Sequence, residues 1–253
     1  MNNFSKVIIF LFASLLFTGC GSSLSDQDLI LQARELIDHE QFSSALIDLD
    51  HVKDKKTEEV ILLRVSALSG LAGFRLFQLY DTIAYNRNVS PKFLIFFNLS
   101  RQYSSTDVSY SRSSIKTIEE FDSNITTRSK GLNTLFALME VYKVSQILLK
   151  NSDLDRLGVL SNKWNPCNDA NFPVLEIKEV IVSLNKVRMA LRQITNDLRD
   201  ADVELLFSSI DEAQKLSGYP FSILDEGNVQ SSDVLNFRNF INKYILGNSN
   251  TCN

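Results

Sequence analysis

The feature that most restricts the fold is a seam of apolar residues in the last third of the chain. Its members follow one another at alternating spacings of three and four: Ile177, Val180, Leu184, Val187, Leu191, Ile194 and Leu198. Such spacing places them all on one side of an α-helix, and other helices must cover that side. The cover could be a second copy, in a coiled-coil dimer, or other helices of the same chain. We expect a bundle within a monomer, because other long helical patterns are available to cover the seam.

Helix breakers are few in the chain, which contains nine glycines and four prolines in 253 residues. A β-sandwich needs many turns and therefore more of these residues. Apolar residues recur at helical spacing from Leu29 to Ile241, as they do in amphipathic helices. The sequence therefore predicts an all-α fold.

The first twenty residues follow a different pattern. Lys6 precedes an apolar run over 7–17, which is too short for a transmembrane helix but has the length of a signal-peptide core. The run ends in Phe17-Thr18-Gly19-Cys20. This resembles the lipobox of bacterial lipoproteins, in which Leu, a small residue, Gly or Ala, and Cys follow one another; Phe17 departs from the pattern. The alternative is a buried N-terminal helix in which Cys20 is an ordinary small apolar residue.

The lipobox resemblance implies a signal peptide over 1–19 and a diacylglycerol and an N-acyl lipid, such as palmitate, on Cys20. Two or more acyl chains hold a protein stably at a bilayer. Residues 20–25 would then be a short lipidated tether, and 26–253 an all-helical domain close to the membrane. Because Gly21 rather than Asp follows the cysteine, the resemblance favours the outer membrane of a bacterial envelope, facing the periplasm.

The two remaining cysteines, Cys167 and Cys252, are expected to form a disulfide, since the periplasm is oxidising. A bridge that closes so long a loop stabilises a fold by up to about 4 kcal/mol in the chain-entropy model. The alternative is two unpaired thiols.

A helical hairpin is predicted at the start of the domain. Its inner face would consist of Leu29, Ala33, Leu36, Phe42, Ala45, Leu49 and Val52. This pattern resembles a tetratricopeptide hairpin, with Ala33 and Ala45 at the small positions and Phe42 at the aromatic one, but the family's proline is missing near Thr57. The resemblance covers one clear repeat, and such folds generally need about three. We therefore expect helical hairpins packed as a tetratricopeptide-like or irregular α–α superhelix or bundle.

The densely apolar stretch 58–79 could be read as a transmembrane helix. Charged residues interrupt or flank it, and Gly70 and Gly73 would let another helix approach closely. We expect a buried core hairpin. By contrast, 103–128 is rich in hydroxyl residues, and we expect either an amphipathic helix or a mobile loop that subdivides the domain.

The most aromatic patch contains Phe93, Phe96 and Phe97. It is expected to be core, and the alternative is the lining of an apolar pocket.

Known catalytic and metal-binding patterns are missing from the sequence. The histidines, His39 and His51, have no cysteine and no acidic cluster at metal-ligand spacing. The chain has no P-loop, no Gly-x-Gly-x-x-Gly and no Gly-x-Ser-x-Gly. We expect no catalysis, no metal and no cofactor besides the lipid on Cys20. The net charge of −4 without a basic tract argues against binding nucleic acid or anionic lipid.

These features together favour a membrane-anchored scaffold or adaptor without catalytic activity, which holds a protein partner in the cell envelope. The alternative is a lipoprotein that binds a small apolar solute for a transporter, with a pocket around Phe93, Phe96 and Phe97.

Overall fold

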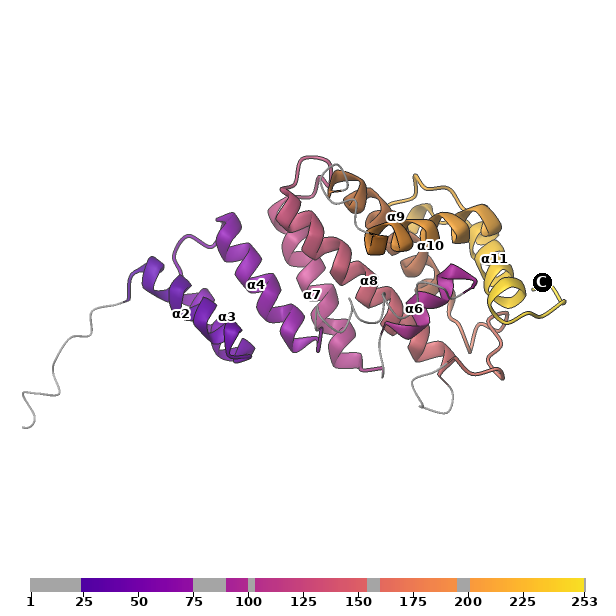
Figure 1. Cartoon of the computed structure of the whole chain (residues 1–253), viewed down its shortest axis with the longest axis horizontal. Coiled ribbons are helices and arrows are strands. Elements are labelled where there is room, and N and C mark those ends of the chain that lie inside the picture. The colour runs from indigo at the N-terminus through magenta and orange to yellow at the C-terminus, as the bar shows by residue number, and fades with distance from the viewer. Residues whose placement is uncertain (1–23, 75–89, 100–102, 154–159, 195–200, 253) are drawn as a thin grey trace, which may run out of the picture.

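The computed structural model describes residues 24–74, 90–99, 103–153, 160–194 and 201–252 (Figure 1). All regular secondary structure in these segments is helical, which confirms the all-α prediction. The elements are α2 (Asp26–Asp38), α3 (Phe42–His51), α4 (Glu58–Leu71), η1 (Lys92–Leu94), α6 (Ile95–Asn98), α7 (Ser105–Phe121), α8 (Lys130–Ser152), α9 (Val174–Ile194), α10 (Ala201–Ser217), η2 (Glu226–Asn228), α11 (Ser231–Phe240) and the π-helix η3 (Ile241–Ile245).

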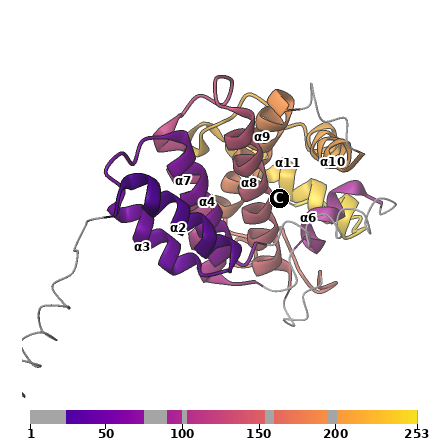
Figure 2. The same ribbon diagram turned by 60° about the vertical axis from the view of Figure 1, so that its left-hand side comes forward.

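Six of the helices are arranged as an array that follows chain order but leaves out η1 and α6, which pack on α10 and α8. Helix α2 packs on α3, α3 on α4, α4 on α7, α7 on α8 and α8 on α9. Figure 1 shows this order along the long axis, with α2 and α3 at one end and α10 and α11 at the other. The turned view in Figure 2 brings α2 and α3 forward, with α10 and α11 on the opposite side of the molecule. Of the helices described, none is long and apolar enough to cross a membrane.

Helix α4 is apolar on two sides because it lies between two apolar clusters. Val60 and Ala67 belong to the hairpin cluster, which also contains Leu29, Ala33, Ala45, Leu49 and Val52. Ile61 and Val65 belong to the main core. The dense apolar pattern at 58–71 is therefore explained by burial on both faces of one helix. Residues 75–79 of the predicted core hairpin lie outside the described residues, so the hairpin stays a prediction.

Close packing of α3 and α4 depends on a glycine. Phe42 lies so close to Gly70 that a Cβ atom added there would be 2.3 Å from the Phe42 ring. Ala33 and Ala45, the predicted small positions of the hairpin, are fully buried.

We expect Gly70→Val to lower the free energy of unfolding by roughly 1–3 kcal/mol, the usual range for overpacking. The added side chain must displace the Phe42 ring. Urea titration followed by circular dichroism measures the change. In the double variant with Gly70→Val, Phe42→Leu should restore part of the lost stability. Equal losses of stability with and without Phe42→Leu would contradict the contact between Phe42 and Gly70.

The seam lies inside the molecule. Its six described members, Ile177 to Ile194, are buried in the main core, and Leu198 lies outside the described residues. Helix α9 packs on α8, α10 and α11. The helices of this chain therefore cover the seam, as expected.

The charged face of α9 is bonded to neighbouring helices. Arg112 of α7 donates two hydrogen bonds to the Glu179 carboxylate, at 2.9 and 2.6 Å. Lys186 pairs with Glu119 at 2.6 Å. Burial alone would raise the pKa of Glu179, but the Arg112 hydrogen bond and the charges of Arg112 and Lys143 outweigh it, so the pKa of Glu179 lies below its usual value.

Because the folded state lowers the pKa of Glu179, its ionised form stabilises the fold above the ordinary value of 4.5, and this contribution is lost as the pH falls through the lowered pKa. We expect Glu179→Gln to lower the free energy of unfolding at neutral pH by about 1–3 kcal/mol, as for hydrogen bonds to charged groups. The difference from wild type should shrink in acid. Urea titrations at neutral and acidic pH test this, with the exposed Glu120→Gln as control; a difference that did not change with pH would contradict it.

The hydroxyl-rich segment 103–128 contains helix α7, as one of the two alternatives predicted. Its hydroxyl groups donate to carbonyls one turn earlier: Ser111 to Asp107, Ser113 to Ser109, Ser114 to Tyr110 and Thr117 to Ser113. Serines bonded in this way are compatible with a helix. Helix α7 packs on both α4 and α8, and a subdivision of the domain near 103–128 stays a prediction.

Candidate functional site

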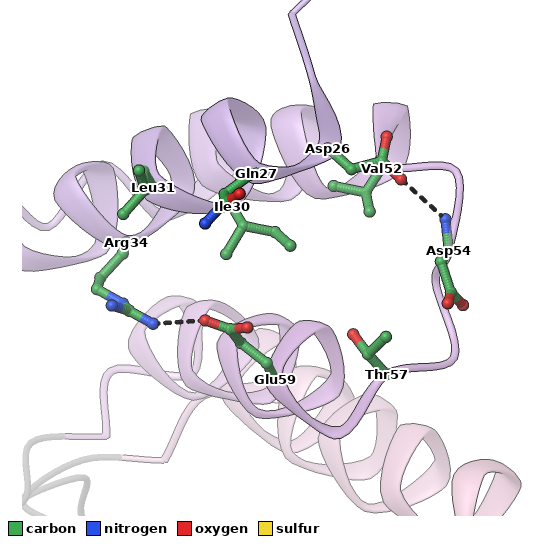
Figure 3. Close-up of a pocket in the computed structure, with 9 residues that line it drawn as sticks. All are labelled: Asp26, Gln27, Ile30, Leu31, Arg34, Val52, Asp54, Thr57 and Glu59. Atoms are coloured by element: carbon green, nitrogen blue, oxygen red, sulfur yellow. Dashed lines mark hydrogen bonds and ion pairs between the residues drawn. The ribbon is translucent and has the colours of Figure 1, made fainter.

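An open groove of about 420 Å³ lies between α2 and the start of α4 (Figure 3). We call it the α2–α4 groove. It is lined by Asp26, Gln27, Ile30, Leu31, Arg34, Val52, Asp54, Thr57 and Glu59.

Capping interactions fix both helix starts at one end of the groove. The Ser25 hydroxyl accepts the Asp28 N–H at 3.2 Å, and the Asp28 carboxylate accepts the Ser25 N–H at 3.1 Å. The Ser25 hydroxyl also donates to the Asp28 carboxylate at 2.6 Å, and this bond, together with the one from the Ser25 N–H, lowers the pKa of Asp28. Thr57 caps α4 by accepting the Val60 N–H at 3.4 Å. Serine and threonine are typical N-cap residues, so both helix starts have a local cause in the sequence.

Asp26 ties the loop between α3 and α4 to the start of α2. Its Oδ2 atom accepts the N–H groups of Lys53 at 3.1 Å and Asp54 at 3.3 Å. Figure 3 shows this contact at one end of the groove and the ion pair between Arg34 and Glu59 at the other.

An ion pair between Arg34 and Glu59 spans the other end of the groove, opposite Asp26 and Asp54. Its N–O distance is 2.7 Å, but the two side chains are 52% and 54% exposed. Exposed pairs of this kind contribute about 0–1 kcal/mol. The pair can therefore open at little cost when a molecule enters the groove.

Three of the nine residues that line the groove are apolar: Ile30, Leu31 and Val52. Val52 is buried, Ile30 is half-buried, and Leu31 is 54% exposed. Leu24 and Ile47, on the same hairpin, are also exposed. An apolar floor with a charged rim is typical of a surface that a partner covers.

The other predicted site residues lie elsewhere. Cys20 lies outside the described residues. Cys167 and Cys252 form a disulfide, with their Cα atoms 5.1 Å apart, and this confirms the predicted pair. His39 and His51 are exposed. Within the described segments, no group of three or more His, Cys, Asp or Glu side chains could hold a metal ion.

Phe93, Phe96 and Phe97 lie in the main core with no exposed surface. Their rings contact one another and the C-terminal elements: Phe93 packs on Phe237 and Phe240 with centroids 6.0 and 5.1 Å apart. Phe97 packs edge-on against Trp164 at 5.9 Å. This is the core arrangement that the sequence favoured, and the ligand-pocket alternative stays a prediction.

Sequence reasoning missed the groove. Leu31 lines the groove but does not belong to the predicted inner face of α2. A leucine outside that face was the signal that the sequence offered for the groove. A leucine on the outer face of a well-patterned amphipathic helix indicates a surface with a partner only when a neighbouring element completes a hollow. Here the start of α4 completes it.

The fold and groove define the class of the protein: an all-α helical array with an open, apolar-floored groove at its N-terminal end. Comparisons of the chain with protein-family models, with curated proteins and with solved structures found no match.

Proposed function

We propose that this protein is a lipid-anchored scaffold without catalytic activity, which docks a protein partner in the α2–α4 groove at the surface of a bacterial membrane. The observation that carries the proposal is the groove, with its exposed Leu31 wall and its loosely closed Arg34–Glu59 end. The lipobox resemblance of Phe17-Thr18-Gly19-Cys20 supports the anchor. The outer membrane, facing the periplasm, is the proposed location.

The array of neighbouring helices also supports a binding role. The α2–α3 hairpin resembles a tetratricopeptide unit, and helical arrays of that kind commonly present extended binding surfaces. Each helix of this array contacts the next one along it, and α2 also contacts α4 across the groove.

Photo-cross-linking in living bacteria tests docking. A photoreactive amino acid is placed at Leu31, which lines the groove, or at Ile47, which is similarly exposed on the same hairpin but lies outside the groove. We expect a discrete adduct with one protein from the Leu31 position and none from Ile47. Adducts from both positions, or from neither, would contradict docking in the groove.

The anchor is tested separately. Metabolic labelling with an alkyne fatty acid should tag the wild-type chain and not Cys20→Ser. The Cys20→Ser chain should leave the membrane fraction and lose the Leu31 adduct. A membrane-bound, unlabelled wild-type chain would contradict the proposed anchor.

A further inference from the structure

The loop that joins α7 to α8 carries an Asn-x-Thr motif on the surface of the molecule. Asn124, Ile125 and Thr126 follow one another there; Asn124 and Thr126 are exposed, and Ile125 is buried. On a surface loop of an exported protein, Asn-x-Ser/Thr is the acceptor pattern for N-linked glycosylation. The same pattern occurs at Asn3, Asn88 and Asn98, but only the Asn124 motif lies entirely within the described residues.

Contacts on both sides of Asn124 hold this loop against the core. The carbonyl of Ile125 accepts the buried Asn133 side chain at 2.9 Å. The carbonyl of Asp122 accepts the Arg128 Nε–H at 2.6 Å, and the Asp122 carboxylate accepts the N–H of Asn124 at 2.9 Å. The loop is thus fixed by its backbone and by Ile125, while the Asn124 side chain is left outside the core.

The Asn124 side chain is bonded through its oxygen. Its Oδ1 atom accepts the N–H of Thr126 at 3.0 Å and the hydroxyl of Thr126 at 2.7 Å. Both bonds leave the Nδ2 nitrogen of this exposed side chain available. Hydrogen bonds donated to the amide oxygen also stabilise the negative charge that develops there when Nδ2 loses a proton. Thr126 therefore lies where it favours reaction at the nitrogen of Asn124.

An acidic residue distinguishes this motif from the others in the chain. Asp122 lies two positions before Asn124, whereas the corresponding positions of the other motifs are held by Met1, Asn86 and Phe96. A carboxylate next to the acceptor is a group that a cationic side chain of a transferase can bind.

We propose that Asn124 is an N-glycosylation site, whose donor is a saccharide carried on a polyprenyl pyrophosphate. The Nδ2 nitrogen attacks the anomeric carbon of the saccharide, so that a C–N bond forms and the C–O bond to the pyrophosphate breaks. The pyrophosphate leaves with the electron pair, and the amide gives one proton to a base of the transferase. This inference rests on the export that the proposed function requires, because the pattern is an acceptor in exported proteins.

Mass spectrometry of the full chain, purified from the bacterium that produces it naturally, tests the site. Trypsin cuts after Lys116 and Arg128 and releases the peptide 117–128 with Asn124 inside it. We expect this peptide to exceed its sequence mass by the mass of a saccharide, and its fragment spectrum to place the saccharide on Asn124. A peptide found only at its sequence mass would overturn the proposal.

Variants of the same loop distinguish the motif from its surroundings. Thr126→Ser keeps the hydroxyl and should keep the saccharide, whereas Thr126→Ala should lose it. Thr127→Ala is the matched control, because it removes an exposed hydroxyl of the same loop outside the motif, and the saccharide should remain. A saccharide that survives Thr126→Ala, or that maps to Ser123 or Thr127, would also overturn the proposal.

The N-terminus of the same sample reports export. A chain that begins at a lipidated Cys20 and has an unmodified peptide 117–128 refutes only the glycosylation. A chain that retains residues 1–19 refutes the export, and with it both the anchor and this inference.

Discussion

Replacing Cys252 with serine is expected to lower the free energy of unfolding by about 2–5 kcal/mol, the usual loss when a native disulfide is removed. The bridge joins residues 85 positions apart, so its loss releases a long loop in the unfolded chain. It also releases the C-terminal tail. Urea titration of the oxidised wild type and of the variant measures the difference.

The tail is held by a second set of contacts, which will keep part of it in place. The N–H of Cys252 donates to the Asn239 side chain at 2.6 Å, and the Asn242 side chain donates to the Asn250 carbonyl at 2.6 Å. The variant should therefore remain folded at room temperature and differ mainly in its unfolding midpoint.

Three controls isolate the bridge. Cys167→Ser and the double variant should lose as much as Cys252→Ser, because each removes the same bond. Reduction of the wild type should reproduce the loss. An unfolding midpoint that reduction leaves unchanged would contradict a stabilising role of the bridge.

Lys143→Met is expected to cost about 3–5 kcal/mol, because it leaves a buried carboxylate without its partner. The Glu140 side chain has no exposed surface, and the Lys143 ammonium lies 2.7 Å from its Oε2 atom. Among the described residues, neither Glu140 oxygen has a partner in hydrogen-bonding geometry, and the attraction from Lys143 is ionic. Lys143 also lies 3.7 Å from Glu179, which connects α8 to α9.

The double variant Glu140→Leu with Lys143→Met distinguishes a buried charge from lost packing. Replacing a whole buried pair with apolar residues is often neutral or stabilising, so the double variant should recover most of the stability lost in Lys143→Met. Urea titration of wild type, both single variants and the double variant gives the coupling. A double variant as unstable as Lys143→Met would show that packing, not the unpaired charge, causes the loss.

The helices and their inner faces could be predicted because they depend on local spacing. The seam of α9 follows from periodicity, whereas the tetratricopeptide resemblance indicated Ala33 and Ala45 as small positions. Helix α10 ends at Ser217, and Gly218 follows at a φ of 77°, which favours glycine. The disulfide could be predicted because few cysteines were available and two remained after Cys20.

The groove and the buried ion pair could not be predicted in the same way. Both depend on which helix lies beside which, and the sequence pattern of a single helix does not contain that. Glu140 and Lys143 look like an ordinary exposed pair one turn apart, until α8 is placed in the middle of the array. In the sequence, Leu31 is an isolated surface leucine of α2. Only the position of α4 in the fold makes it part of a groove.

The position of Phe93 has a consequence for the order in which the protein is made. The Phe93 ring packs on the Phe240 ring. At a rate of protein synthesis of about 5–20 residues per second, roughly 7–30 s separate the synthesis of these two residues. During that interval the hairpin cluster already has all of its members, whereas the phenylalanines of 93–97 still lack their last partners. The residues that pack the N-terminal hairpin are therefore available on the chain before those that complete the main core.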